Sequence, residues 1–274
     1  MTFVKRALTV LVGLPAVSFV AYKGGTPLVV ACGLIAVVGL WEFYRAFGLP
    51  QSVQAVGFGF AILHFVAVGL FGVVIWETIV LCFASLAALS VLRYGSLSLQ
   101  DAVMSLFGFL YVPFLLSFVV LVRNTYGGAF YVTVLFVACF GCDTFAYLTG
   151  SIIGKCRLKN TPSPSKTVEG TAGGILGAVL FAFLVPFSLM RLEIGVFAGL
   201  NFEGLAFLTV ITAAGASLSV FGDMFGSLIK RSTGIKDFGS IFPGHGGIMD
   251  RLDSVVLVAP FVYIVAQVVH TDVF

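Results

Sequence analysis

The chain has 274 residues, of which 59% are hydrophobic and only 10% are charged, and its formal net charge is +3. A soluble fold of this length could not cover its surface with so few charged side chains, because soluble domains carry about 25%. The composition therefore excludes soluble enzymes, disordered chains and secreted disulfide scaffolds, and the small net charge gives no sign of a nucleic-acid partner. It predicts a polytopic integral membrane protein.

Nine stretches without Asp, Glu, Lys or Arg follow one another along the chain, and each can hold one transmembrane helix of roughly 20 residues, the shorter ones by borrowing a charged residue at an end. They are too long and too rich in Leu, Phe and Gly for the alternating strands of a membrane barrel. We therefore predict an all-α fold with about nine transmembrane helices. The stretches are residues 7–22, 24–41, 46–76, 78–92, 102–122, 124–142, 170–190, 204–222 and 254–271.

The basic residues orient this stack, because Lys and Arg are enriched in cytoplasmic loops. With the N-terminus in the cytoplasm and nine spans, twelve of the fifteen basic residues fall inside and only Lys23, Arg123 and Arg191 fall outside. An even number of spans would break this pattern. The C-terminus is therefore predicted to lie outside, and residues 154–169 and 230–253 form two cytoplasmic loops.

Four acidic residues lie inside or beside the predicted spans, where carboxylates are costly and usually functional. Asp223 would share one helix face with Ser227 and Lys230, and Asp250 would share another with Asp253. Asp143 ends the sixth apolar stretch. Oxygen ligands of this kind suit Mg²⁺. The alternative is that nearby Lys and Arg pair with these carboxylates and that they only join helices.

The two cytoplasmic loops carry the features of a phosphate site. The sequence PGHGG at 243–247 runs into a helix start, where free backbone N–H groups favour anions. SPSKTVEG at 163–170 supplies hydroxyls and a lysine before another Gly-rich helix start. The basic residues nearby are Lys166, Lys230, Arg231, Lys236 and Arg251. Together the loops predict a polyphosphate site at the cytoplasmic face.

The C-terminal third carries a dense pattern, rich in polar residues and glycines, made of Ser227, Lys230, Arg231, Lys236, Asp237, Gly239, Phe242, Pro243, His245, Gly246, Gly247, Ile248, Asp250, Arg251, Leu252 and Asp253. This pattern resembles the signature of the CDP-diacylglycerol synthases, also called phosphatidate cytidylyltransferases. CDTFAYLTG at 142–150 and SPSKTVEG are similar to a second conserved region of that family. The resemblance covers most of residues 100–274, whereas residues 1–100, with about four predicted helices, match only in hydropathy. It therefore divides the chain into an N-terminal membrane region, 1–100, and a catalytic membrane region, 101–274.

The resemblance implies a reaction in phospholipid synthesis, in which CTP and phosphatidate give CDP-diacylglycerol and pyrophosphate at the inner membrane of a bacterium. It implies Mg²⁺ held by Asp223 and Asp250 with help from Asp143, and leaves open a second cation such as K⁺ and a homodimer. The implied catalytic residues are Asp223, Lys230, Arg231, Lys236, Asp250 and Arg251. The implied substrate-binding residues are Ser165, Lys166, Thr167, Glu169, Ser227, His245, Gly246, Gly247 and Asp253.

Two other functions remain open at this point. A CTP-dependent membrane lipid kinase would also join a basic loop to acidic residues, but it would transfer the γ-phosphoryl group to an alcohol. An ion-coupled transporter would place charges at mid-span in two related halves. Here the charges gather toward the cytoplasmic face, which disfavours the transporter.

The predicted orientation can be tested with a cysteine introduced at Ser163 in the first cytoplasmic loop. We expect a membrane-impermeant maleimide to label it only from the cytoplasmic side of oriented vesicles. Labelling from the outer side alone would contradict both the orientation and the access of cytoplasmic CTP to the site.

Overall fold

A computed structural model describes residues 17–193, 195–197, 200–241 and 246–268. Within these residues the secondary structure is helical, with no strand; Arg157 and Thr167 form an isolated antiparallel bridge. Seven helical segments are long and apolar enough to cross a membrane, and the helix Glu77–Leu92 is a shorter apolar one. The prediction of an all-α polytopic membrane protein is confirmed.

Eight of the nine predicted spans coincide with a described helix. The first, 7–22, lies mostly outside the described residues, so the count of nine stays a prediction. The sixth predicted span stopped before Asp143, but the helix continues to Ile153, because a single carboxylate interrupts an apolar stretch without interrupting the backbone hydrogen bonds. Asp143 therefore lies inside a helix.

The chain divides into two compact units, neither of which is continuous in sequence. The first consists of residues 1–124 with 232–252, and the second of 125–231 with 253–274. The division of the chain at residue 100 came from the sequence signature and stays a prediction; the compact units have other boundaries.

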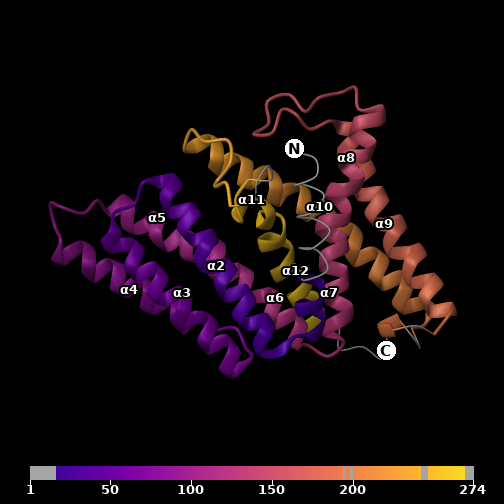
Figure 1. The fold of residues 1–274 in the computed structure, drawn as a ribbon, viewed down its shortest axis with the longest axis horizontal. Helices are drawn as coiled ribbons and strands as arrows, with labels where there is room; N and C mark the ends of the chain where they lie inside the picture. Colours follow the sequence, from indigo (N-terminus) through magenta and orange to yellow (C-terminus); the bar gives the residue numbers. More distant parts are fainter. Residues whose placement is uncertain (1–16, 194, 198–199, 242–245, 269–274) are drawn as a thin grey trace. The chain divides into compact units, whose positions relative to one another are not determined.

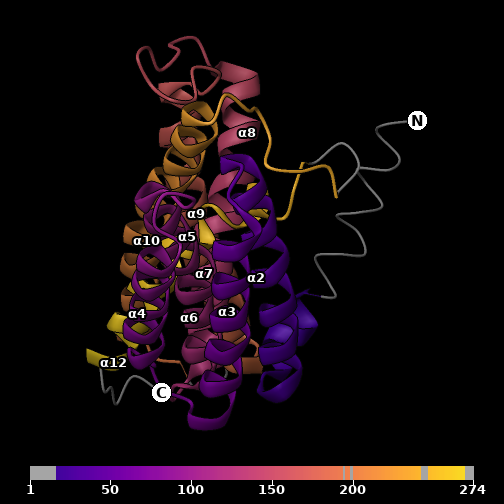
Figure 2. The same ribbon diagram turned by 90° about the vertical axis from the view of Figure 1, so that its left-hand side faces the viewer.

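The first unit is built on α2 (Gly25–Phe47), α3 (Gln51–Phe71) and α4 (Glu77–Leu92), which run side by side in Figures 1 and 2. A long helical segment follows, made of α5 (Leu99–Phe109), a π-helical turn η1 (Leu110–Phe114) and α6 (Leu115–Asn124). The π turn contains Pro113, whose missing N–H breaks the regular helical ladder. The short α11 (Met249–Leu252) completes this unit.

Buried polar side chains in the first unit are paired with one another. The ring nitrogens of His64 lie 2.8 Å from the Thr78 hydroxyl and 3.0 Å from the Ser117 hydroxyl, which joins α3, α4 and α6. The hydroxyl of Tyr44 donates to the Ser105 carbonyl at 2.9 Å. Because lipid offers no hydrogen-bond partners, such pairs hold a membrane bundle together.

The second unit contains a long segment made of α7 (Gly128–Phe136), a π-helical turn η2 (Val137–Gly141) and α8 (Cys142–Ile153). The loop after α8 leads into α9 (Val168–Arg191). After the 3₁₀ turn η3 (Gly195–Phe197) come α10 (Phe202–Ser232) and α12 (Val255–Val268). The turn η2 ends at Gly141, two residues before Asp143, and π turns are common beside functional residues.

Helices α8 and α9 pack closely because glycines of α9 face α8. A Cβ on Gly174 would lie 2.8 Å from both the Ala146 Cβ and the Cys142 carbonyl oxygen. A Cβ on Gly177 would lie 2.5 Å from the Phe145 Cβ. Small residues at such positions let helix backbones approach in a membrane, where the packing itself drives association.

This packing predicts that Gly174→Ala destabilises the protein by about 1–3 kcal/mol, because the added methyl group must displace the backbone of α8. The measurement is the midpoint of thermal unfolding in detergent. The matched control is Gly59→Ala in α3, where no atom lies within 4 Å of the new Cβ. A midpoint for Gly174→Ala equal to that of the control would contradict close packing at this position.

Candidate active site

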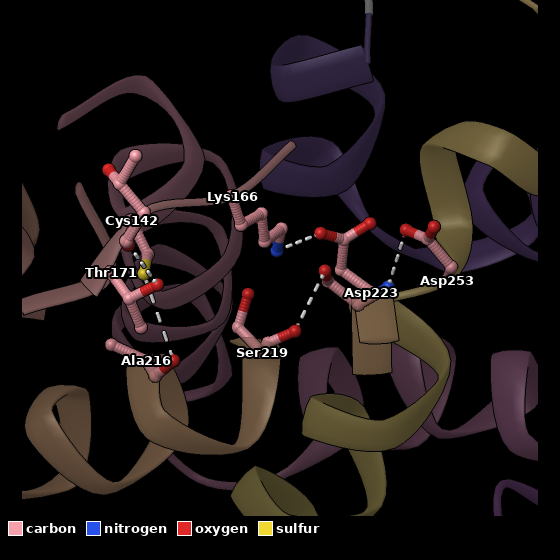
Figure 3. A network of polar contacts seen from close by, with 9 residues as sticks. Cys142, Lys166, Thr171, Ala216, Ser219, Asp223 and Asp253 are labelled. Atoms are coloured by element: carbon pink, nitrogen blue, oxygen red, sulfur yellow. Dashed lines mark hydrogen bonds and ion pairs between the residues drawn. The ribbon is translucent and has the colours of Figure 1, made fainter. Parts of the chain in front are cut away.

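The loop after α8 brings a lysine onto an acidic residue of α10. The ammonium group of Lys166 forms an ion pair with Asp223 Oδ2, and each side chain is 26% exposed (Figure 3). These residues are 57 positions apart in the sequence. Lys166 is therefore not simply a solvated lysine of a surface loop, and Asp223 has a cation beside it.

A cavity of about 210 Å³ lies beside this pair in the second unit. It is smaller than the roughly 300–1,000 Å³ typical of ligand pockets, and it has room for a phosphate group. Asp143 lines it, as predicted for a residue of the site. The other lining residues are Cys142, Ala146, Tyr147, Gly150, Ser165, Lys166, Thr167, Gly170, Thr171 and Val220.

Two predicted substrate-binding residues hold the loop itself. The Thr167 hydroxyl accepts a hydrogen bond from the Gly170 N–H at 3.0 Å, which caps the N-terminus of α9. Both carboxylate oxygens of Glu169 lie 3.1 Å from the Cys156 nitrogen, whose N–H donates to them. These bonds fix both ends of the segment that carries Lys166.

A second carboxylate, that of Asp253, lies near Asp223. Asp253 is 5% exposed, and it interacts electrostatically with Asp223, Asp143 and Lys230. Its Oδ1 accepts a hydrogen bond from the Ser254 N–H at 2.9 Å, and the Ser254 hydroxyl donates to the Ser219 carbonyl at 3.1 Å (Figure 3). The second unit thus gathers three carboxylates around Lys166 and Lys230.

Two glycines of α10 allow this approach of Asp253. A Cβ on Gly222 would lie 2.7 Å from the Asp253 carbonyl oxygen, and one on Gly226 would lie 2.7 Å from the Asp253 Cβ. Asp223 and Lys230 lie on the same helix, together with Ser227, which is buried. The predicted shared face of α10 therefore lies on one unbroken helix.

The prediction that Asp250 and Asp253 share one face of a single helix is wrong. Helix α11 ends at Leu252 and α12 begins at Val255, so Asp253 lies in the turn between the two helices, whereas Asp250 lies in α11. Asp250 belongs to the first unit and Asp253 to the second. The continuous apolar sequence after Asp253 hid this break, because hydrophobicity alone does not reveal a turn.

In the first unit, Asp250 connects two segments of the backbone. Its Oδ2 accepts hydrogen bonds from the N–H groups of Phe238 and Gly247, both at 2.9 Å. Gly246 adopts a φ of +82°, and a Cβ there would lie 2.7 Å from Asp250 Oδ2. A side chain at Gly246 would therefore be strained both by its backbone angle and by this carboxylate.

A model of the family described as "Cytidylyltransferase family" matches residues 4–269. The chain belongs to the cytidylyltransferase family.

Some relatives match this chain over almost its whole length, and others match it over about half of its length. A phosphatidate cytidylyltransferase of Staphylococcus saprophyticus is 31% identical over 264 residues, which cover 94% of this chain and 97% of that protein. One of Thermotoga maritima is 37% identical over 161 residues, 59% of this chain and 57% of that protein. One of Haemophilus influenzae is 36% identical over 140 residues, 51% of this chain and 46% of that protein. The last two matches thus span only about half of those relatives.

The residues predicted for a cytidylyltransferase site are divided between the two compact units. The second unit contains Asp143, Ser165, Lys166, Thr167, Glu169, Asp223, Ser227, Lys230, Arg231 and Asp253. The first unit contains Lys236, Gly246, Gly247, Asp250 and Arg251. His245 lies outside the described residues. The roles assigned to all these residues stay predictions.

The sequence analysis missed Glu42, which lies in α2 and contacts the Gly-rich loop of the family signature within the first unit. It fell between two apolar stretches, beside Arg45, and there it resembles an ordinary residue of a short loop. The sequence did contain one indication, since an acidic residue directly abuts the apolar stretch 24–41.

Proposed function

We propose that the protein is a phosphatidate cytidylyltransferase, which converts CTP and phosphatidate to CDP-diacylglycerol and pyrophosphate in the membrane. The observation that carries the proposal is the Lys166–Asp223 pair beside a phosphate-sized cavity, in a chain that belongs to the cytidylyltransferase family. The names of the relatives support the same substrates.

In this reaction a phosphate oxygen of phosphatidate attacks the α-phosphorus of CTP. The bond from that phosphorus to the β-phosphate oxygen breaks, and pyrophosphate leaves with the electron pair. The attacking phosphate is already an anion near neutral pH, since its second pKa is about 6, so no strong base is required. The difficulty is the repulsion between two anions and the charge on the leaving group.

Positively charged side chains of the protein can offset this repulsion between the two anionic substrates. Lys166, Lys230 and Arg231 belong to one compact unit, and each can pair with a phosphate oxygen. Two more cations of the family signature, Lys236 after α10 and Arg251 in α11, would add positive charge. We call residues 233–248, between α10 and α11, the signature loop. Asp223 pairs with Lys166, and this ion pair keeps the lysine beside the cavity.

The acidic residues fit a magnesium ion by their chemistry. Within the described residues, no three His, Cys, Asp or Glu side chains form a metal site by themselves. Mg²⁺ needs no such cage, because it is usually bound by one or two carboxylates together with substrate phosphates. We propose that Asp223 and Asp250 hold it with help from Asp143. When bound, it would neutralise phosphate charge and stabilise the leaving pyrophosphate.

The length of α10 supports a site at the cytoplasmic boundary. Its 31 residues extend for about 46 Å, whereas the hydrocarbon core is about 30 Å thick. A helix that starts at the outer boundary therefore emerges near Asp223. With the proposed orientation, Lys230 and Arg231 would lie among the head groups, where a water-soluble nucleotide and a lipid phosphate can meet.

The activity is tested with purified protein, phosphatidate, Mg²⁺ and CTP labelled on either the α- or the γ-phosphate. We expect α-label to enter the lipid fraction on thin-layer chromatography and γ-label to appear in pyrophosphate. A lipid kinase would give the reverse result, with γ-label in the lipid. The absence of lipid label from both substrates would overturn the proposed function.

Asp223→Asn is expected to lower turnover by roughly 100-fold or more, because a single group that stabilises the transition state electrostatically typically contributes about 10²–10³ in kcat. The measurement is initial rate at saturating substrates, with thermal unfolding in detergent as a check on folding. Asp101→Asn, at the start of α5, is the control and should keep the wild-type rate. Near-normal turnover of a folded Asp223→Asn protein would remove this carboxylate from the proposed metal site.

Lys166→Ala is expected to weaken the use of CTP by about 1–3 kcal/mol in kcat/KM, the scale of one charge-assisted hydrogen bond. The effect on the dependence on phosphatidate should be smaller. Lys159→Ala is the matched control, since Lys159 is an exposed lysine of the same loop. If Lys166→Ala and Lys159→Ala show the same CTP dependence, Lys166 is not part of the nucleotide site.

A further inference from the structure

The buried carboxylate of Glu42, in α2, has no role in the proposed reaction. Its side chain is completely buried within the first unit. Oε2 accepts a hydrogen bond from the Met249 N–H at 2.9 Å, whereas Oε1 has no hydrogen-bond partner among the described residues. Removing a carboxylate from water costs several kcal/mol, so the fold keeps this residue against a penalty.

Two glycines of the signature loop leave room for this carboxylate. A Cβ on Gly239 or on Gly247 would overlap Glu42 Oε1. The Cα of Gly247 would also lie 3.2 Å from a Cβ on Gly239, so the two backbone segments touch each other at Glu42. Phe238, Gly239 and Gly247 form the base of the loop, and we call these three residues the loop base.

Asp250 binds the same loop base through two hydrogen bonds. Its Oδ2 accepts from the N–H groups of Phe238 and Gly247, and Met249, which donates to Glu42, is its neighbour in the chain. The backbone at residues 247–250 is therefore held by two carboxylates. One of them, Asp250, is proposed to bind Mg²⁺, whereas Glu42 is buried behind the loop.

We infer that Glu42 is a positioning residue, which fixes the loop base and thereby the direction of Asp250 and Arg251. It acts through the Met249 N–H and through close packing on Gly239 and Gly247, without contact with substrate. The inference rests on the proposed function, because it assigns the purpose of this contact to the metal and nucleotide site. It also gives the N-terminal region, which lacks a signature, a part in catalysis.

The first experiment compares Glu42→Ala and Glu42→Gln with the wild-type protein in detergent. Glu42→Ala should raise the Mg²⁺ concentration for half-maximal rate by about 10-fold, as removal of an outer-shell partner of a metal site does, with little change in the KM for phosphatidate. Glu42→Gln keeps an oxygen that can accept from Met249, so it should lie much closer to wild type. A merely structural role would lower stability without this selective change in Mg²⁺ dependence.

Hydrogen exchange provides a readout that does not depend on activity. In peptides that cover residues 246–252, Glu42→Ala should speed the exchange of the Met249 amide by about fivefold or more, because its acceptor is lost. Glu42→Gln should preserve most of the protection. If Glu42→Gln exchanges as slowly as wild type but is as inactive as Glu42→Ala, the negative charge rather than positioning is required, and the inference fails.

The second experiment tests the packing contact with a double-mutant cycle. Gly239→Ala should give the same rise in Mg²⁺ requirement as Glu42→Ala, because its methyl group displaces the carboxylate. In the Glu42→Ala background the methyl group has room, so Gly239→Ala should add less than about twofold. Gly59→Ala, in open space on α3, is the control and should change nothing. Independent, multiplying effects of Glu42→Ala and Gly239→Ala would overturn the proposed contact.

These outcomes separate the inference from the proposed function. If wild-type protein forms no CDP-diacylglycerol, the proposed function fails, while Met249 exchange still reports whether Glu42 holds the loop base. If wild-type protein is active and Glu42→Ala folds with unchanged Mg²⁺ dependence and unchanged exchange, only the inference fails. Should Glu42→Ala not fold, Glu42→Gln and Gly239→Ala carry the same comparison.

Discussion

The carboxylates near the candidate site lie where little water can reach them, so each needs a cation or an N–H group of the protein as a partner. This requirement organises the structure. Asp223 has the ammonium group of Lys166, Asp253 has the Ser254 N–H, and Asp250 has two N–H groups of the loop base. A carboxylate left without such partners in lipid would cost several kcal/mol. The loops are therefore folded onto the helices by the same acidic groups that the proposed reaction needs.

Glycine makes these pairings geometrically accessible. On α9, Gly174 and Gly177 let α8 approach, and this packing forms the wall of the cavity beside Asp143. On α10, Gly222 and Gly226 admit the backbone and side chain of Asp253. The high glycine content of the sequence thus serves two purposes, the approach of helices in lipid and the approach of charged side chains to one another.

The sequence predicted the helical membrane fold and most of the spans, because apolar length is a direct consequence of bilayer thickness. It also brought Asp143 and Lys166 into one hypothesis, and the structure places both on one cavity. It did not predict the turn between α11 and α12 or the continuation of α8 beyond Asp143, since neither changes the pattern of apolar residues. Glu42 was missed because its partners, Gly239 and Met249, lie about 200 positions away.

The discontinuity of the first compact unit has a consequence for biosynthesis. Residues 1–124 reach the membrane early, but their partner segment 232–252 is made only after almost all of the second unit has been translated. Until the ribosome has added Met249, Glu42 has no N–H from that residue to accept. During this time the Glu42 side chain lacks its hydrogen bond from Met249. It must then be protonated, or it must contact water or the insertion machinery. The first compact unit is thus completed only near the end of synthesis, when residues 232–252 have been made.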